Sequence, residues 1–319
     1  MISSQMDADV ARVAAALPRL DIADISQARL VNDALLAPLH AALSYEGVRV
    51  TRIAVPSDDG SAAASLRLMR PVDAGAATPV LLAMHGGGFV LGRSEDFDYF
   101  CLEAVRRLGI TVANVDYRLA PETVFPGPLD DCVAALRFVH AQASELGIDP
   151  TRIAVGGSSA GGCLAAATVL RARDEGGPAV AFQLLLSPAT DDRWRDPAPT
   201  GDMPFEGDRT TELVWESYLG PDYDGPEDEK VSAYAVPARA EDLSGLPSTY
   251  IAAMESDPIR DSNIEYARRL LRAGVRVELH CHPGTFHGSA ELAPQAASSA
   301  RVIDGLVEAL GRGLSVDAP

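Results

Sequence analysis

The sequence contains very little positive charge. Of its 319 residues, 27 are Lys or Arg and 45 are Asp or Glu, which gives a formal net charge of −18. Lys230 is the only lysine. Binding to nucleic acid requires a basic face, and adsorption to anionic lipid requires basic clusters. We therefore expect neither a nucleic-acid nor a membrane partner.

Cysteines and long apolar runs are also scarce. The four cysteines are scattered without metal-ligand spacing, so we expect no metal site and reduced thiols in the core. Residues 1–20 lack the basic start and apolar run of a signal peptide, and no stretch is long enough to span a bilayer. These absences predict a cytoplasmic protein. The cysteines are Cys101, Cys132, Cys163 and Cys281.

The hydrophobic pattern predicts an α/β fold. Residues 7–45 have helical periodicity, interrupted by Pro18 and Pro38. Two alternating segments, 48–55 and 64–69, follow as an antiparallel hairpin. From residue 79, short apolar runs alternate with helical segments, which indicates a mostly parallel sheet with helices on both faces. The expected strands are 79–84, 111–115, 152–155, 182–186, 249–254 and 275–280, and the expected helices are 95–108, 128–146, 160–175 and 261–273.

Residues 190–247 break this alternation. The segment is rich in Pro, Asp and Gly but also carries several aromatic residues. A disordered linker would not carry so many. We expect a lid packed over a binding site, with Phe205 and Trp215 lining a pocket. Packing of these two side chains inside the lid is the alternative. Phe89, which follows a run of glycines, is expected to wall the same site.

Ser159 is the most informative residue of the chain. It stands at the apex of a tight turn between an apolar strand and an alanine-rich helix, with Gly157 and Gly161 on either side. A G-x-S-x-G pattern between a strand and a helix is typical of a nucleophile elbow. Such a serine needs a base that takes its proton, usually a histidine oriented by a carboxylate.

Asp257 and His287 are the best candidates for that carboxylate and that base. Each follows an apolar strand, and the chain order Ser, Asp, His is the one used on this kind of sheet. Glu255 and Asp261 are the competing carboxylates, but an N-capping role suits Asp261.

His280 and His282 alternate with Cys281 at an expected strand end. We interpret them as structural or solvated. A His-x-His pair is able to bind metal, but the sequence offers no third ligand at a sensible spacing.

The segment His85-Gly-Gly-Gly88 directly follows an expected strand. Consecutive glycines let the backbone come close to a substrate and turn its amides inward. Backbone N–H groups in such a position stabilise the oxyanion that forms when an ester is attacked. Ala160, at the start of the helix after the nucleophile, offers a further amide. A plain glycine turn is the alternative.

The segment Asp116-Tyr-Arg-Leu-Ala-Pro-Glu122 carries three charges in seven residues at a strand end. We interpret Asp116, Arg118 and Glu122 as an internal ion-pair network that braces the loop beside the elbow.

Together these motifs resemble the bacterial hormone-sensitive lipase family of α/β-hydrolases, over residues 75–290. The motifs are His-Gly-Gly-Gly-Phe, Asp-Tyr-Arg-Leu-Ala-Pro-Glu, the serine elbow, Asp-Pro-Ile-Arg-Asp and Phe-His-Gly. Within the family the chain looks closest to the heroin-esterase-like group. The resemblance implies one α/β-hydrolase domain over 1–319. Its eight-stranded sheet would have an antiparallel second strand, and residues 1–45 and 190–240 would form a helical cap.

The resemblance also implies a function. It assigns Ser159, Asp257 and His287 as a catalytic triad and the amides of Gly87, Gly88 and Ala160 as the oxyanion hole. The family hydrolyses carboxylic esters, usually of short acyl chains, without a cofactor. The substrate would be a small-molecule ester. One departure is visible, because the family commonly has Asp or Glu before the nucleophile, where this chain has Ser158.

Three other functions remain open at the level of sequence. The same machinery serves amidases, thioesterases and lactonases. A non-catalytic ligand-binding module on this fold typically lacks the histidine, which is present here. A membrane-active lipase would need a long apolar lid, and the acidic composition argues against it.

An exposed last strand would favour a homodimer by analogy.

Overall fold

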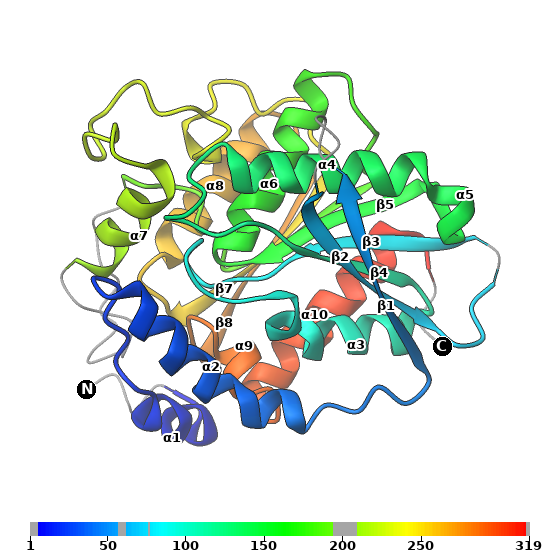
Figure 1. Ribbon diagram of the computed structural model, residues 1–319, viewed down its shortest axis with the longest axis horizontal. Coiled ribbons are helices and arrows are strands. Elements are labelled where there is room, and N and C mark those ends of the chain that lie inside the picture. Colours follow the sequence, from blue (N-terminus) through cyan, green and yellow to red (C-terminus); the bar gives the residue numbers. More distant parts are fainter. Residues whose placement is uncertain (1–5, 57–61, 76, 194–208, 317–319) are drawn as a thin grey trace.

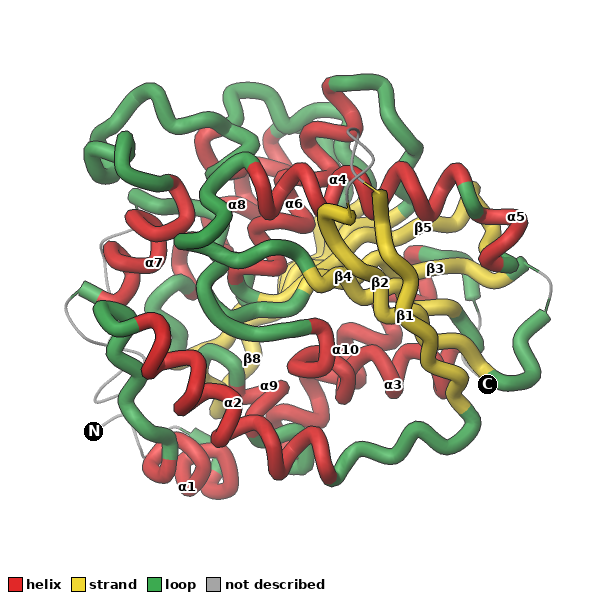
Figure 2. Tube along the Cα trace, in the orientation of Figure 1, coloured by secondary structure: helices red, strands yellow, loops and turns green. Residues whose placement is uncertain are grey.

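A computed structural model describes residues 6–56, 62–75, 77–193 and 209–316. Eight strands form one sheet in the order β1-β2-β4-β3-β5-β6-β7-β8. Figure 2 shows the strands of this sheet in yellow. Only β2 runs antiparallel to its neighbours, as the resemblance implied. The strands are β1 Val48–Pro56, β2 Ala62–Pro71, β3 Thr78–Met84, β4 Thr111–Asp116, β5 Ile148–Ser158, β6 Phe182–Leu186, β7 Ser248–Ser256 and β8 Val277–Phe286.

Helices cover both faces of the sheet (Figure 1). They are α1 Ala8–Ala16, α2 Ile25–Ala41, α3 Asp98–Leu108, α4 Gly127–Ala141, α5 Ala143–Leu146, α6 Ala160–Asp174, α7 Thr210–Leu219, α8 Arg260–Arg272, α9 Ser289–Leu292 and α10 Ala297–Gly313, with short 3₁₀ turns η2 Ser94–Phe97 and η3 Pro237–Arg239. Helices α4, α6 and α8 lie on one face and α3 and α10 on the other.

The alternation of side chains along the central strands explains these two layers. In β3, Val80 and Leu82 join the apolar cluster shared with α4, α6 and α8, whereas Leu81 and Ala83 join the cluster shared with α3 and α10. Successive side chains of a strand point to opposite faces, so a strand covered on both sides is apolar throughout. The expected α/β class is therefore confirmed.

Several boundaries differ from the sequence-based expectation. The helix expected over 128–146 ends at Ala141 and resumes as α5. Pro38 does not end the helix at the expected point, since it lies in the last turn of α2, which continues to Ala41. Strand β8 extends to Phe286, so His280 and His282 lie within it rather than at its end.

The cysteines also differ in part from the expectation. Cys101, Cys132 and Cys163 are buried, as expected of core thiols. Cys281 is exposed and lies on β8, one of the two edge strands of the sheet.

Helices α2 and α7 lie near each other beyond the carboxyl ends of the central parallel strands (Figure 1). Arg29 anchors α2 there, since its guanidinium donates to the carbonyl oxygens of Val90 and Ala120 at 2.8 and 3.0 Å and pairs with Glu122. Within the described ranges, no helix is long and apolar enough to cross a membrane.

Candidate active site

Ser159 occupies a strained turn between β5 and α6. Its φ of 53° and ψ of −117° lie outside the regions that most residues adopt. A hydrogen bond from its N–H to the carbonyl of Leu186, at 2.9 Å, holds the turn. Gly161 permits the close approach of the helix, because a Cβ there would lie 2.2 Å from the carbonyl oxygen of Met84. The local glycine pattern therefore has a direct steric reason.

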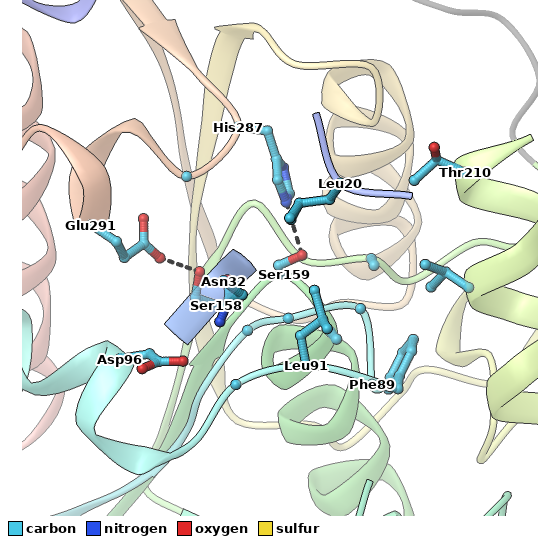
Figure 3. Close-up of a pocket in the computed structure, with 18 of the residues that line it drawn as sticks. Leu20, Asn32, Phe89, Leu91, Asp96, Ser158, Ser159, Thr210, His287 and Glu291 are labelled. Atoms are coloured by element: carbon cyan, nitrogen blue, oxygen red, sulfur yellow. Dashed lines mark hydrogen bonds between the residues drawn. The ribbon is translucent and has the colours of Figure 1, made fainter. Parts of the chain in front are cut away.

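The structure brings Asp257 and His287 to this serine, and Figure 3 shows His287 pointing toward Ser159. Nε2 of His287 lies 2.8 Å from Oγ of Ser159, and Nδ1 of His287 lies 2.8 Å from Oδ2 of Asp257. Asp257 follows β7 and His287 follows β8 directly. Asp257 is fully buried, and its Oδ1 accepts a hydrogen bond from the N–H of Ile259 at 2.9 Å. Each of the two carboxylate oxygens of Asp257 therefore has a hydrogen-bond partner.

The charges around His287 set its proton affinity. Burial by itself lowers the pKa of His287, but the charge and hydrogen bond of Asp257 raise it, with a smaller contribution from Glu291. The net result is a pKa above the ordinary histidine value. The site therefore favours the protonated imidazole more than water does.

The competing carboxylates lie elsewhere. Oε2 of Glu255 accepts a hydrogen bond from the N–H of Gly284 at 2.8 Å. Asp261 pairs with Arg260. The expectation that Asp261 caps α8 was wrong, because the helix already begins at Arg260 and the turn before it is closed by Asp257.

The glycine loop after β3 lies against the elbow. A Cβ on Gly86 would lie 3.4 Å from Cβ of Ser159. Gly87 has a φ of 112°, and its carbonyl accepts hydrogen bonds from the N–H groups of Val90 and Leu91 at 3.1 and 2.8 Å. A side chain at Gly87 would collide with the carbonyl of Leu91 at 2.2 Å, so only glycine fits this turn.

His85, at the start of the glycine loop, helps to hold this loop in place. Its ring stacks on Tyr117 with centroids 4.3 Å apart, and the hydroxyl of Tyr117 donates to the carbonyl of His85 at 2.8 Å. Nδ1 of His85 lies 2.7 Å from the carbonyl oxygen of Gly86. Burial lowers the pKa of His85, so the ring is neutral and donates this hydrogen bond from Nδ1.

A cavity of about 260 Å³ opens at Ser159. It is lined mainly by apolar side chains from the N-terminal segment, the glycine loop and α7. Figure 3 labels Leu20, Asn32, Phe89, Leu91 and Thr210 around the serine. Segments that are far apart in the sequence therefore build one pocket around the hydroxyl.

The aromatic residues expected at the pocket take different places. Phe89 and Trp215 both line the cavity. Both are also buried, and the ring of Phe89 stacks on Tyr218 of α7 with centroids 3.9 Å apart. Trp215 thus lies at the wall of the cavity and also packs against Phe89, and its contact with a substrate stays a prediction. Phe205 lies outside the described residues.

Asp116, Arg118 and Glu122, which were expected to form an internal ion-pair network, each pair with a residue of another element. Asp116 pairs with Arg52, Arg118 with Asp131, and Glu122 with Arg29. The chain turns after β4, which points the three side chains toward different elements. Each still braces the loop, but against a separate partner.

Two acidic residues at the site were missed by sequence analysis. Asp96 of η2 and Glu291 of α9 both line the cavity at Ser159 and a second cavity of about 580 Å³ behind it. Burial raises the pKa of Asp96 to about 6 and also raises the pKa of Glu291. The sequence offered one indication for Glu291. It lies only four residues after His287, so a single helical turn is able to place it near the same site.

A family model described as the alpha/beta hydrolase fold matches residues 81–291 of the chain. The chain belongs to the α/β-hydrolase family. This hydrolase lies in the hormone-sensitive-lipase-like branch and is a serine carboxylic ester hydrolase. It is 51% identical to a solved bacterial heroin esterase, with a TM-score of 0.93 over 98% of this chain and 99% of that one.

Two curated relatives of the hydrolase are also esterases. Esterase LipI of Mycobacterium tuberculosis is 39% identical over 75% of this chain and 72% of its own length. Ethyl acetate hydrolase of Pseudomonas putida is 35% identical over 70% of each chain.

Proposed function

We propose that this hydrolase cleaves short-acyl, acetyl-type esters through a Ser159–His287–Asp257 triad and a covalent acyl-enzyme. The observation that carries the proposal is the unbroken hydrogen-bond chain from the Ser159 hydroxyl through His287 to the buried Asp257. A nucleophile, a base and an orienting carboxylate in that order are what acyl transfer by serine requires.

In the first half-reaction, Oγ of Ser159 attacks the ester carbonyl while its proton moves to Nε2 of His287. The carbonyl carbon becomes tetrahedral, and its oxygen becomes an oxyanion. Collapse of this intermediate breaks the bond to the alcohol oxygen, and His287 returns the proton to the departing alcohol. Asp257 holds the ring in the required tautomer and stabilises its protonated form.

The amides of Gly87, Gly88 and Ala160 receive the oxyanion in this proposal. Gly86 next to them lies against Ser159, and Ala160 begins α6, where the first N–H groups have no partner within the helix. Preorganised amides of this kind lower the barrier by several kcal/mol because they need not reorient during the reaction.

In the second half-reaction, water replaces the alcohol. His287 takes a proton from the water, the hydroxide attacks the acyl carbon, and the acid leaves as the bond to Oγ of Ser159 breaks. The proton on His287 returns to the serine. No cofactor takes part in either half of this cycle.

The size of the cavity supports a short acyl group. About 260 Å³ of mostly apolar space lies around Ser159, with Phe89 and Trp215 in its walls. A relative named ethyl acetate hydrolase supports the same preference. We further propose one domain over residues 1–319, in which residues 1–45 and 190–240 form the cap that closes this space.

We propose a homodimer and a cytoplasmic location as well. β8 is the last strand of the sheet and pairs with β7 alone, which leaves an edge that a second copy is able to continue. Four free thiols suit a reducing compartment. Light scattering coupled to size exclusion tests the dimer.

The test of the triad is Ser159→Ala, assayed with p-nitrophenyl acetate. We expect kcat to fall by several orders of magnitude while the variant unfolds at the wild-type temperature. Ordinary activity in this variant would refute the assignment. A serine-directed phosphonate should also form one covalent adduct with the wild type and none with the variant.

Matched ester, amide, thioester and lactone substrates test the reaction class. We expect the ester to give the highest kcat/KM, and acetyl esters to exceed octanoyl esters. A higher kcat/KM for the amide, thioester or lactone would favour the corresponding alternative activity on the same triad.

A further inference from the structure

Ser158 and Glu291 join the two loops that carry the nucleophile and the base. Ser158 ends β5 and directly precedes Ser159, and Glu291 lies in the single turn of α9, four residues after His287. The hydroxyl of Ser158 donates a hydrogen bond to Oε1 of Glu291 (Figure 3). One contact therefore ties the elbow to the segment that holds the catalytic histidine.

The segment around His287 needs such a contact. Helix α9 has only four residues, and Gly288 before it adopts a left-handed conformation with a φ of 83°. A single turn has little stability of its own. Displacement of a catalytic group by about 1 Å is able to cost about 10²-fold in rate. A hydrogen bond from the elbow to α9 keeps the distance between Nε2 and Oγ short.

The charge of Glu291 also reaches His287. Burial raises the pKa of Glu291, whereas the hydrogen bond from Ser158 and the charge of His287 act in the opposite direction. When it is ionised, Glu291 contributes to the raised pKa of His287, together with Asp257. The carboxylate thus favours the protonated imidazole that forms in each half-reaction.

Other charged groups around Glu291 belong to several elements. The charged and titratable side chains lining the two cavities that meet at Glu291 are Asp9 and Arg12 of α1, His40 of α2, Glu95 and Asp96 of η2, Tyr99 of α3, Asp191 after β6, and Asp257 and His287 beside the elbow. Asp96 lies 3.0 Å from His40, and Arg12 pairs with Asp9. Of these groups, Asp257 and His287 act directly on the charge of Glu291.

We propose that Glu291 and Ser158 form a positioning pair, which holds His287 against Ser159 and lends the imidazolium a second carboxylate. This inference rests on the proposed triad. A serine at position 158 suits the pair because its hydroxyl donates to an ionised Glu291. An aspartate there would have to share a proton with Glu291, since two adjacent carboxylates resist joint ionisation.

Three variants test the pair. Glu291→Gln keeps a hydrogen-bond acceptor for Ser158 and removes the charge. Ser158→Ala removes the donor alone. Glu308→Gln is the matched control, because it removes one carboxylate from an exposed position on α10. Each is assayed for kcat, KM and the dependence of kcat/KM on pH, alongside the thermal unfolding temperature and Ser159→Ala.

We expect Glu291→Gln to move the acidic limb of kcat/KM to lower pH by about half a unit, since a negative charge beside His287 is lost. We expect Ser158→Ala to lower kcat about tenfold with KM within about twofold, because the base is held less firmly. The double variant should be no slower than the slower single variant. Glu308→Gln should match the wild type.

Two results would overturn the pair. One is an acidic limb that stays in place in Glu291→Gln. The other is additive losses in the double variant. Ser159→Ala separates this failure from failure of the triad: an inactive Ser159→Ala with an unmoved limb rejects the pair alone, whereas an active Ser159→Ala rejects the proposed function. If Glu291→Gln folds poorly, Ser158→Ala tests the positioning role by itself: a kcat equal to that of the wild type would reject the pair.

Discussion

Nε2 of His287 lies 2.8 Å from Oγ of Ser159, although 128 residues separate them in the chain. Parallel strands place their carboxyl ends at one edge of the sheet, so the loops after β5 and β8 reach the same space. The proposed base and nucleophile are therefore in hydrogen-bond contact.

Replacement of Asp257 by asparagine should remove most of the activity. The amide is similar in size but stabilises the wrong tautomer of His287 and no longer balances its charge. By analogy with serine proteases, we expect kcat to fall about 10⁴-fold with a small change in KM. Steady-state kinetics with p-nitrophenyl acetate measures this. Asp261→Asn, in a neighbouring pair with Arg260, should stay near wild-type activity. Equal losses in both variants would contradict the assignment of Asp257.

The activity should fall as the pH drops through the pKa of His287. Attack requires the neutral imidazole, and Asp257 raises the pKa of His287 against the opposing effect of burial. The acidic limb of kcat/KM should therefore lie above the ordinary histidine value of about 6.5. His85 should not contribute, because burial lowers its pKa. A pH series of kcat/KM from 4 to 9 measures the limb, and a midpoint well below 6 would speak against this origin.

Gly161→Ala should destabilise the protein. The added Cβ would lie 2.2 Å from the carbonyl oxygen of Met84 and 2.3 Å from that of His85, and neither backbone group is able to move far. We expect a loss of about 1–3 kcal/mol or more in the free energy of unfolding, measured by urea denaturation. Gly75→Ala is the control, because nothing lies within 4 Å of its Cβ position. Equal stability of the two variants would show that the elbow tolerates the side chain.

Asp192→Ala should destabilise the segment that follows β6. Asp192 is fully buried, accepts two hydrogen bonds from Arg239 at 2.9 and 2.7 Å, and accepts a third from Tyr223. Its removal leaves a nearly buried guanidinium without its carboxylate, which costs about 3–5 kcal/mol.

A matched surface pair provides the comparison for that measurement. Glu265 and Arg268 pair on α8, with half of the arginine side chain exposed. Because solvent screens such pairs, Glu265→Ala should cost roughly 0–1 kcal/mol in the same urea experiment. A similar loss in both variants would argue against a special role for the buried pair.

Local sequence patterns predicted those parts of the site whose geometry depends on a few neighbouring residues. Gly157, Ser159 and Gly161 identify an elbow because a tight strand-to-helix turn admits only small residues at those positions. The glycine run after β3 is readable for the same reason, since Gly87 needs a conformation that other residues avoid. The class of the fold follows from the alternation of apolar runs and helical segments.

Long-range pairing was not readable in the same way. The charges of Asp116, Arg118 and Glu122 suggested one network, but each side chain meets a partner from a different element. The sequence showed that Ser158 departs from the family pattern, but not that Glu291, 133 residues away, is its partner. Cys281 was predicted to be a core thiol, but it is exposed on β8, an edge strand of the sheet.

The sequence by itself determined the fold class, the serine elbow, the glycine loop and the chain order of the three candidate catalytic residues. Steric limits and hydrophobic periodicity act over a few residues, so they leave a trace in the sequence. Tertiary structure decided the 2.8 Å contacts among Ser159, His287 and Asp257, the walls of the cavity, and the contact between Ser158 and Glu291. These depend on which loops the sheet brings together, and that is fixed only when the whole core packs.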